Sequence, residues 1–364
     1  MNWNQIRQDH IKEISSLYLN TASNGLIPHS IQHSMNDEQN KFMKNPSAYR
    51  NEFILNSIPS IRKKLASLLN ASPEQFALVP NFSIGLNLLL PSLQIQKVGL
   101  IKGDYPSLNL PFTESALDVV FLDDLINTDL NSIEQFIIQN NLELLAISHV
   151  QWLNGYAIDL HELSQLCKRN NCLLLADATQ SFGALEIDLK KSEVDILAAS
   201  CYKWACAGFG NGFMYIDSEV LDKHRPKSAG FNSTSFLQGN TDYTAGIRSY
   251  EPGHHDHEAF KRMQFALDRI IHIGVTNIQA RISYFMDLLI GELTRNNIEF
   301  VGPFPEKNRS GIVTLESKDG LIDYLNKSGV ECVERDKKIR ISIHYYNNEA
   351  DIAEFLKLLL NYSG

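Results

Sequence analysis

The sequence has little cysteine, and its few cysteines form no recognisable pattern. Among 364 residues there are five cysteines, an odd number, and no two of them have CxxC spacing. Neither a disulfide framework nor a zinc site is therefore expected, and a reducing compartment such as the cytoplasm fits. Long apolar runs are also missing, because no stretch approaches the roughly 20 residues of a membrane span. The first residues lack an apolar signal region, so the cytoplasm is the expected compartment.

The chain also has few basic residues relative to acidic ones. Its 33 Lys and Arg residues are outnumbered by 42 Asp and Glu residues, which gives a formal charge of −9. With no basic run, neither nucleic acid nor an anionic membrane is expected as a partner. Apolar residues make up 44% and charged residues 21%, which is typical of a soluble globular enzyme.

Seven short apolar runs, most of them separated by segments with helical spacing, predict an α/β fold. They span residues 76–80, 97–102, 119–123, 144–150, 173–179, 196–200 and 213–216. Runs of this length bounded by Gly and Asp are typical of buried strands in a mostly parallel sheet. Strands and helices alternate again near the C-terminus and predict a small α+β domain. We expect an N-terminal segment (1–24) packed on the small domain and active site, a large domain (25–258), and a helical connection with the small domain (259–364).

Two charged residues follow neighbouring apolar runs. Asp177 ends the run that begins at Leu173, and Lys203 comes directly after the run 196–200. Ligands of such sheets bind beyond the carboxyl ends of the strands, so an acid and an amine are expected in one crevice. That pair suits pyridoxal phosphate (PLP). A lysine holds the PLP aldehyde as a Schiff base, and an acid keeps the pyridine nitrogen protonated.

The motifs around these residues resemble the class V aminotransferase family. D-A-T-Q-S-F-G spans 177–183 and A-S-C-Y-K-W spans 199–204, in the order and spacing of that family, which includes cysteine desulfurases, kynureninases and isopenicillin-epimerase-like proteins. The resemblance covers most of the chain and implies fold type I, with a seven-stranded, mostly parallel sheet sandwiched by helices. It implies that Lys203 and Asp177 are catalytic. Most members have His at the position of Tyr202, whereas kynureninase-like members have Tyr there, as this chain does.

The resemblance assigns several residues to the phosphate of PLP. A polar turn at 81–87 leads from a strand into a helix, where free N–H groups and the helix dipole favour an anion. Phe82 and Ser83 would bind the phosphate there, together with Ser200 and Tyr202. The alternative is that Ser83 is only a helix N-cap.

Three further residues are assigned to the PLP ring. Tyr105, in Gly-Asp-Tyr-Pro-Ser, is expected to stack on the ring. Asn154 and Gln180 are expected to reach the ring oxygen, the imine or the substrate. A turn aromatic and an ordinary Asn-Gly turn are the alternatives for Tyr105 and Asn154.

His254 stands where the family usually has a Thr that reaches the phosphate of the partner subunit. The resemblance therefore implies a homodimer with shared active sites and His254 as a cofactor ligand across the interface. His254, His255 and His257 could also suggest a metal. No second cluster with fixed ligand spacing accompanies them, so no metal is predicted.

Three residues are expected to bind the substrate. Asn24 lies in a polar loop that resembles the family segment beside the substrate. Arg335 and Arg340 flank the short turn 336–338, and either guanidinium could bind the α-carboxylate in bidentate fashion. The alternative for both arginines is a charge on a surface strand.

The resemblance implies a PLP-dependent enzyme of the class V aminotransferase type that acts on a small amino acid or related amine through a Lys203 Schiff base. Transamination is the nominal reaction, and epimerisation or C–S lysis stays open. A cysteine desulfurase or selenocysteine lyase is the second hypothesis. It ranks second because the desulfurase branch most like this chain carries a loop with a reactive Cys at a position where this chain has only residues 336–338. Cys332 lies in a predicted strand. A non-catalytic protein with the PLP fold is the other alternative.

Overall fold

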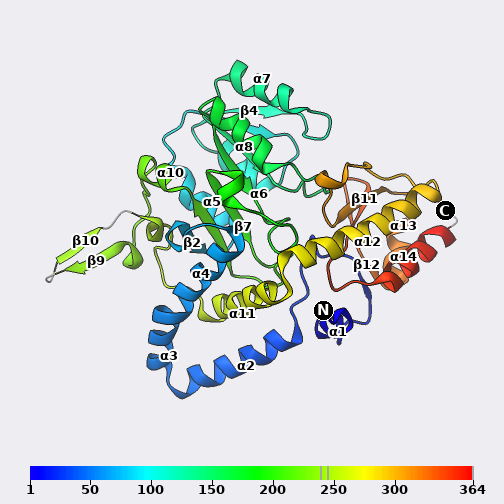
Figure 1. Cartoon of the computed structure of the whole chain (residues 1–364), viewed down its shortest axis with the longest axis horizontal. Helices are drawn as coiled ribbons and strands as arrows, with labels where there is room; N and C mark the ends of the chain where they lie inside the picture. The colour runs from blue at the N-terminus through cyan, green and yellow to red at the C-terminus, as the bar shows by residue number, and fades with distance from the viewer. Residues whose placement is uncertain (238–239, 244–245, 363–364) are drawn as a thin grey trace.

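A seven-stranded sheet forms the centre of the fold. The computed structural model describes residues 1–237, 240–243 and 246–362. The strands are β2 (Phe76–Val79), β3 (Lys97–Ile101), β4 (Asp118–Leu122), β5 (Leu144–Ser148), β6 (Leu173–Asp177), β7 (Ile196–Ser200) and β8 (Gly212–Ile216). Their order is β2-β8-β7-β6-β5-β3-β4, with β8 antiparallel to both of its neighbours and the remaining pairs parallel (Figure 1). The predicted seven-stranded, mostly parallel sheet is confirmed.

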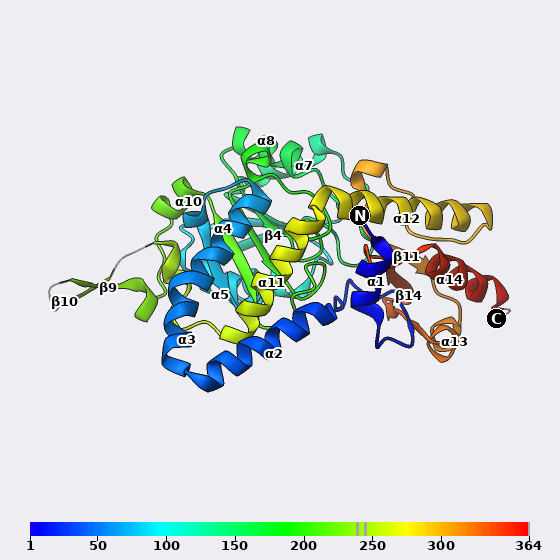
Figure 2. The same cartoon turned by 60° about the horizontal axis from the view of Figure 1, so that its bottom comes forward.

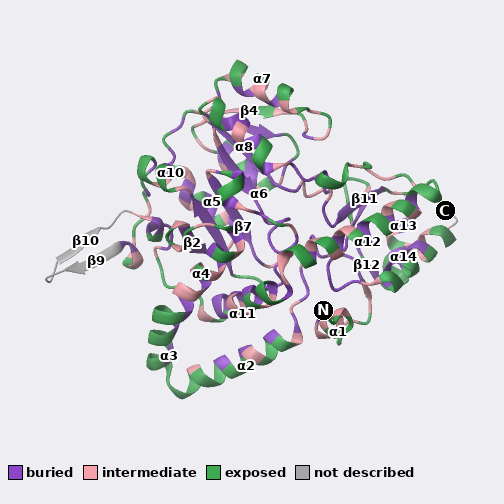
Figure 3. Cartoon of the chain, in the orientation of Figure 1, coloured by how far each residue is buried: buried purple, intermediate pink, exposed green. Residues whose placement is uncertain are grey.

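Helices cover both faces of this sheet because successive side chains along each strand point to opposite faces. Leu144 packs in the core beneath α5 (Phe82–Leu89) and α6 (Pro106–Thr113), whereas Leu145 packs in the larger core on the other face. The helices on that second face are α4 (Ile58–Leu69), α7 (Leu130–Asn140), α8 (Leu160–Arg169) and α11 (His257–Ile273). Figure 3 shows the strands buried between these helices.

A smaller unit follows α11. Its antiparallel sheet has the order β11 (Ile312–Glu316), β14 (Lys338–Ser342), β13 (Val333–Arg335). The helices around it are α12 (Val275–Arg295), α13 (Leu321–Lys327) and α14 (Glu349–Asn361), which agrees with the strands and helices expected near the C-terminus (Figure 2). The division of the chain at residues 24 and 258 stays a prediction.

The N-terminal segment reaches this smaller unit. Strand β1 (Leu17–Tyr18) pairs with β12 (Val330–Glu331) in parallel. Helix α1 (Trp3–Ile11) is held by Arg7, whose guanidinium donates two hydrogen bonds of 2.8 Å to the carboxylate of Asp351. Residues from the start of the chain are therefore positioned by residues from its end.

The remaining elements connect these parts. They are α2 (His29–Lys44), α3 (Pro46–Glu52), α9 (Leu189–Ser192), α10 (Ser218–Lys223) and the hairpin β9 (Thr234–Leu237) and β10 (Asn240–Tyr243). Between α3 and α4 the chain is π-helical over Phe53–Ser57. Pro59 follows and has no N–H to donate, so a regular ladder cannot run through this point. No helix within the described ranges is long and apolar enough to cross a bilayer.

Candidate functional site

Asp177 and Lys203 meet at the carboxyl ends of two neighbouring strands. Asp177 is the last residue of β6 and pairs with Ala198 of β7, and Lys203 lies in the loop that follows β7. Only 4% of Asp177 and 5% of Lys203 is exposed. The Nζ atom of Lys203 lies 5.2 Å from the centre of the Tyr105 ring and 5.6 Å from that of Tyr202. The amine therefore sits between two aromatic faces.

Burial changes the protonation of both groups in the direction that brings them towards neutrality. It raises the pKa of Asp177 to about 6, although the Thr179 N–H, 2.8 Å from Oδ1, and the charge of Lys203 act the other way. Burial also lowers the pKa of Lys203 to about 8 against the attraction of Asp177. A buried lysine with a lowered pKa is suited to nucleophilic and acid–base work.

Asp177 lines a cavity of about 390 Å³, and so do Tyr105 and Tyr202, the two rings near Lys203 Nζ. The cavity is lined by Asn81, Phe82, Ser83, Ile84, Tyr105, Asp177, Thr179, Ser200, Tyr202, Phe209 and Gly210. Six of these were predicted as site residues, whereas Asn81, Ile84, Thr179, Phe209 and Gly210 were not. Thr179 lies within the D-A-T-Q motif, and Asn81 is the first residue of the predicted phosphate turn, so both belong to motifs that the sequence shows.

The N-terminus of α5 forms one end of this cavity. Asn81 caps the helix, since its Oδ1 accepts from Ile84 N at 2.9 Å. The alternative of capping by Ser83 is therefore wrong. Ser200 Oγ accepts from Phe82 N at 2.9 Å, and the Ser83 N–H and hydroxyl have no hydrogen-bond partner in the described part of the chain. The helix end thus presents free donors to an anion.

Aromatic side chains form the walls. The Tyr202 ring stacks on Phe209 with 4.6 Å between centroids, and burial raises the pKa of Tyr202 to about 12. Tyr105 contacts the edge of the Trp152 ring at 5.6 Å. Its N–H donates to Asp104 Oδ1, a buried carboxylate that also accepts from Ser148. The main chain of Tyr105 is therefore held in place by the Asp104 carboxylate.

The side chains of Gln180 and Asn154 make hydrogen bonds to other residues of the chain. Gln180 accepts from Trp204 Nε1 at 2.7 Å and donates to the main-chain oxygen of Ala22 at 3.0 Å. Asn154 Oδ1 accepts from Tyr156 N at 2.8 Å, as in an ordinary Asn turn. Neither residue lines the cavity. Their contacts with PLP stay predictions.

Arg340 and Arg335 lie on one face of the small sheet but differ in burial. Val333 pairs with Arg340 and Arg335 with Lys338, so both arginines alternate onto the same side. Arg340 is only 3% exposed, and its charge helps to lower the pKa of Lys203. Arg335 is exposed at the edge of the sheet.

The N-terminal loop reaches Arg340 through a residue that was not predicted. Arg340 Nη2 donates to Ser23 Oγ at 2.7 Å. Asn24, the predicted residue, accepts from Tyr18 Oη through its main-chain oxygen at 2.5 Å. Substrate binding by Asn24 stays a prediction.

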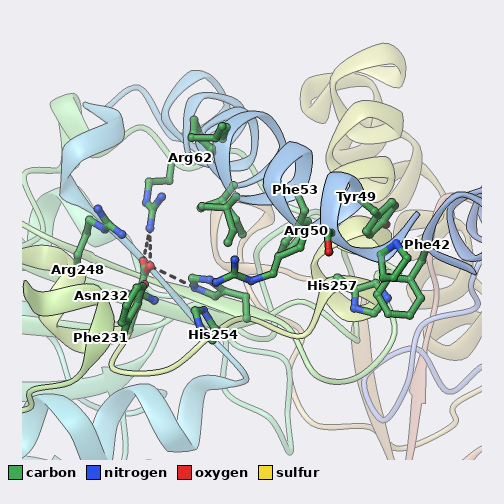
Figure 4. A pocket seen from close by; sticks show the side chains of 18 residues that line it. Phe42, Tyr49, Arg50, Phe53, Arg62, Phe231, Asn232, Arg248, His254 and His257 are labelled. Carbon is green, nitrogen blue, oxygen red and sulfur yellow. Dashed lines mark hydrogen bonds and ion pairs between the residues drawn. The ribbon is translucent and has the colours of Figure 1, made fainter. Parts of the chain in front are cut away.

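His254 lies outside this cavity. It lines a second pocket of about 640 Å³ (Figure 4). The His254 side chain is exposed there, and its ring centroid lies 5.2 Å from that of Phe231. Two further histidines line this pocket in different surroundings. His255 Nε2 is 3.2 Å from Glu251 Oε2, and His257 stacks on Phe42 at 4.7 Å. The described residues contain no cluster of three or more metal-ligating side chains.

All five cysteines are free and buried. Cys332 is 7% exposed, and burial raises the pKa of its thiol to about 12. A thiol in such surroundings is a poor nucleophile, because the thiolate is the reactive form.

This set of donors fits PLP. The cavity has the size of a small-molecule site, Lys203 offers an amine with a lowered pKa for the aldehyde, and Asp177 offers a carboxylate for the ring nitrogen. The free donors at Ser83 face the same space and suit the phosphate.

Comparisons with known proteins agree with this fit. The family described as "Aminotransferase class-V" matches residues 17–355. An uncharacterised aminotransferase, YcbU of Bacillus subtilis, is 26% identical over 300 residues, which cover 80% of each chain. A probable cysteine desulfurase of Pyrococcus abyssi is 23% identical over 386 residues, covering 97% of this chain and 96% of the relative.

Solved structures show the same fold. A mutant of C-DES with glycine covalently linked to its PLP cofactor superposes with a TM-score of 0.89 at 19% identity, covering 98% of this chain and 99% of C-DES. C-DES is described as a cystine C–S lyase in a second structure, with a TM-score of 0.87 at 20% identity, covering 96% of this chain and 98% of C-DES. The predicted fold of PLP enzymes of fold type I is confirmed.

Proposed function

Since the chain belongs to the class V aminotransferases, a family of PLP-dependent enzymes, we propose that it converts a small amino acid or related amine on PLP held by Lys203. The observation that carries the proposal is the buried pair Asp177 and Lys203 at the ends of adjacent strands beside one cavity. A surface lysine and a surface aspartate would lack both the altered pKa values and the enclosed space.

The chain's own residues divide the work. PLP, when bound, supplies a sink for the electrons released at the substrate Cα. Asp177 would hold a proton at the ring nitrogen, Ser83 and the first turn of α5 would bind the phosphate, and Tyr105 would cover the ring. Lys203, once released by the incoming amine, would move the proton at Cα, and its lowered pKa suits that task near neutral pH.

Arg340, rather than Arg335, would bind the substrate carboxylate. It is buried, its charge acts on Lys203, and its Nε–H has no partner within the described residues. A guanidinium with free donors in a buried place favours a carboxylate. Arg335 is exposed at the sheet edge and would bind at most the rim of a substrate.

Transamination is the reaction we propose first, and C–S lysis is the second candidate. The second is favoured by the likeness to C-DES and by the probable desulfurase of Pyrococcus abyssi. A desulfurase that stores sulfur on its own thiol is disfavoured, because Cys332 is buried with a raised thiol pKa. A lyase needs no protein thiol, since the sulfur leaves with the product.

One experiment separates these reactions. The PLP-loaded enzyme is incubated with single amino acids while the visible absorbance, the release of sulfide and the formation of keto acid are followed. Conversion of the cofactor to its pyridoxamine form without loss of the side chain supports transamination. Pyruvate together with sulfide from cysteine, or together with cysteine persulfide from cystine, supports the lyase. A protein that binds PLP but changes no amino acid or amine would support the non-catalytic alternative.

We also propose a homodimer with shared sites, in the cytoplasm. The position of His254, exposed in a pocket separate from that of Lys203, supports a role toward a second copy. Co-expression of Lys203→Ala and His254→Ala subunits tests it. Mixed dimers should recover activity that both single variants lack, because one of their two sites is intact. The free cysteines support the compartment.

A further inference from the structure

The guanidinium of Arg340 is held by two oxygen atoms from distant parts of the chain. Nη2 donates to Ser23 Oγ at 2.7 Å, and Nη1 donates to the main-chain oxygen of Trp152 at 2.9 Å. A guanidinium has five N–H donors in a rigid plane, so these two bonds fix the direction of that plane and leave three donors free. Nε is one of them, buried and without a partner within the described residues.

The segment that carries Ser23 is itself fixed on two sides. We call residues 20–25 the strap. Ala22 N donates to Ser342 Oγ of β14 at 2.8 Å, and Gln180 Nε2 donates to the Ala22 oxygen at 3.0 Å. Ser23 therefore stands at a defined place between the small sheet and the loop after Asp177.

The far end of the strap lies on the lysine loop. Gly25 N donates to the main-chain oxygen of Tyr202 at 2.9 Å. A Cβ atom on Gly25 would lie 1.9 Å from the Lys203 carbonyl oxygen, so the two backbones are in direct contact. The hydroxyl of Ser23 is consequently placed relative to the residue that carries the reacting amine.

Trp152 connects the same guanidinium to that amine from another direction. Its carbonyl holds Arg340, and its ring packs against Tyr105, which lies beneath Lys203 Nζ. Arg340 and Lys203 thus belong to one frame of hydrogen bonds and ring contacts. Among the described residues, Ser23 supplies the one side-chain oxygen that accepts a hydrogen bond from Arg340.

We propose that Ser23 is a positioning residue that aims Arg340 at the substrate α-carboxylate, so that the strap sets the preference for α-amino acids over amines that lack a carboxylate. This inference rests on the proposed function, in which Arg340 binds that carboxylate. Without the Ser23 hydroxyl, the guanidinium plane turns and meets the carboxylate with one hydrogen bond in place of two. The loss of one charge-assisted bond corresponds to about 10-fold in affinity.

The test compares pairs of ligands that differ only in the carboxylate: L-alanine with ethylamine, and L-serine with ethanolamine. Binding to the PLP-loaded protein is measured from the change in the visible absorbance of bound PLP, which requires no turnover. The wild-type protein should bind each amino acid more tightly than its amine. Ser23→Ala should reduce this preference about 10-fold and leave the affinity for the amines unchanged. Ser23→Gly repeats the loss of the hydroxyl, and Ser23→Thr should restore the preference.

Thr21→Val is the matched control. It removes another hydroxyl from the strap, one that bonds Tyr346 Oη at 2.6 Å and does not touch Arg340. The preference should stay at the wild-type value. An equal loss in Thr21→Val would assign the effect to a loosened strap and overturn the role of the Ser23 hydroxyl.

Arg340→Gln separates this inference from the function on which it rests. If Arg340→Gln loses the preference while Ser23→Ala and Ser23→Gly keep it, Ser23 does not position Arg340, but the carboxylate site stands. If Arg340→Gln keeps the wild-type preference, or if the wild-type protein itself shows no preference for the amino acids, the proposed carboxylate site is overturned.

Discussion

Gly25 and Lys203 are in backbone contact, because a Cβ atom on Gly25 would lie 1.9 Å from the Lys203 carbonyl oxygen. Gly25→Ala should therefore displace the strap or the lysine loop and lower the free energy of unfolding by about 1–3 kcal/mol. Gly291→Ala in α12 is the control, since nothing lies within 4 Å of its added Cβ. Denaturant unfolding measures both. Wild-type stability in Gly25→Ala would show that the contact yields easily.

Lys203→Ala should fold but form no covalent bond with PLP. The visible absorbance of the loaded protein should disappear, and borohydride treatment should no longer attach the cofactor to the chain. Lys102→Ala, which removes an exposed lysine after β3, should behave as the wild-type protein does. If the Lys203→Ala protein keeps the wild-type band after dialysis, another amine holds PLP.

The rate of PLP capture by the apoprotein should rise with pH and reach half its maximum near pH 8. Only a neutral amine attacks an aldehyde, and burial lowers the pKa of Lys203 to about 8. Capture is thus fast above this pH and is lost as the pH falls through it. Rapid-mixing absorbance measures the rate, with Nα-acetyl-lysine as a reference for the titration of PLP itself. A midpoint near the ordinary lysine value of about 10.4 would contradict the role of burial.

Asp177→Asn should retain PLP and lose about 100-fold or more in turnover. The amide keeps an oxygen that can accept from Thr179 N, so the fold should survive. It cannot carry the negative charge that keeps the ring nitrogen protonated. Steady-state kinetics on the substrate found by the amino-acid screen, with PLP occupancy measured in parallel, give the comparison. Full turnover at full occupancy would refute the role of Asp177.

No protein-bound persulfide should form when the loaded enzyme is incubated with L-cysteine. Each of the five thiols is buried, and Cys332 has a raised pKa. Intact-protein mass spectrometry should show the unmodified mass, and Cys332→Ser should leave any sulfide release unchanged. A mass increase of one sulfur atom that vanishes in Cys332→Ser would restore the desulfurase reading.

Much of the central sheet could be predicted because buried parallel strands are short, continuous apolar runs with clear ends. Those ends also placed Asp177 and Lys203 together. The helix cap could not be predicted, since Asn81 and Ser83 are both good caps two residues apart. The choice between Arg335 and Arg340 was also out of reach, because it depends on β14 lying between β11 and β13 in the small sheet.

Other parts of the site depend on contacts that leave no local signal. Ser23 meets Arg340 across 317 residues of sequence, so its neighbours in the chain do not reveal the bond. Gln180 has the right position for a cofactor ligand, yet its amide bridges Trp204 and Ala22. Sequence spacing shows which side chains reach a region, whereas packing decides what each one touches there.

The pairing of β7 with β8 has a consequence for how this enzyme can be altered. Ser200 and Gly212 pair across the antiparallel ladder of β7 and β8. Both ends of the link 201–211, which carries Lys203, are therefore held by the sheet. A one-residue slip of this pairing would turn every side chain of β8 to the opposite face of the sheet, so changes in the link must keep Ser200 opposite Gly212. Engineering of substrate choice should therefore start from β13 and β14, which belong to the small sheet and not to this ladder.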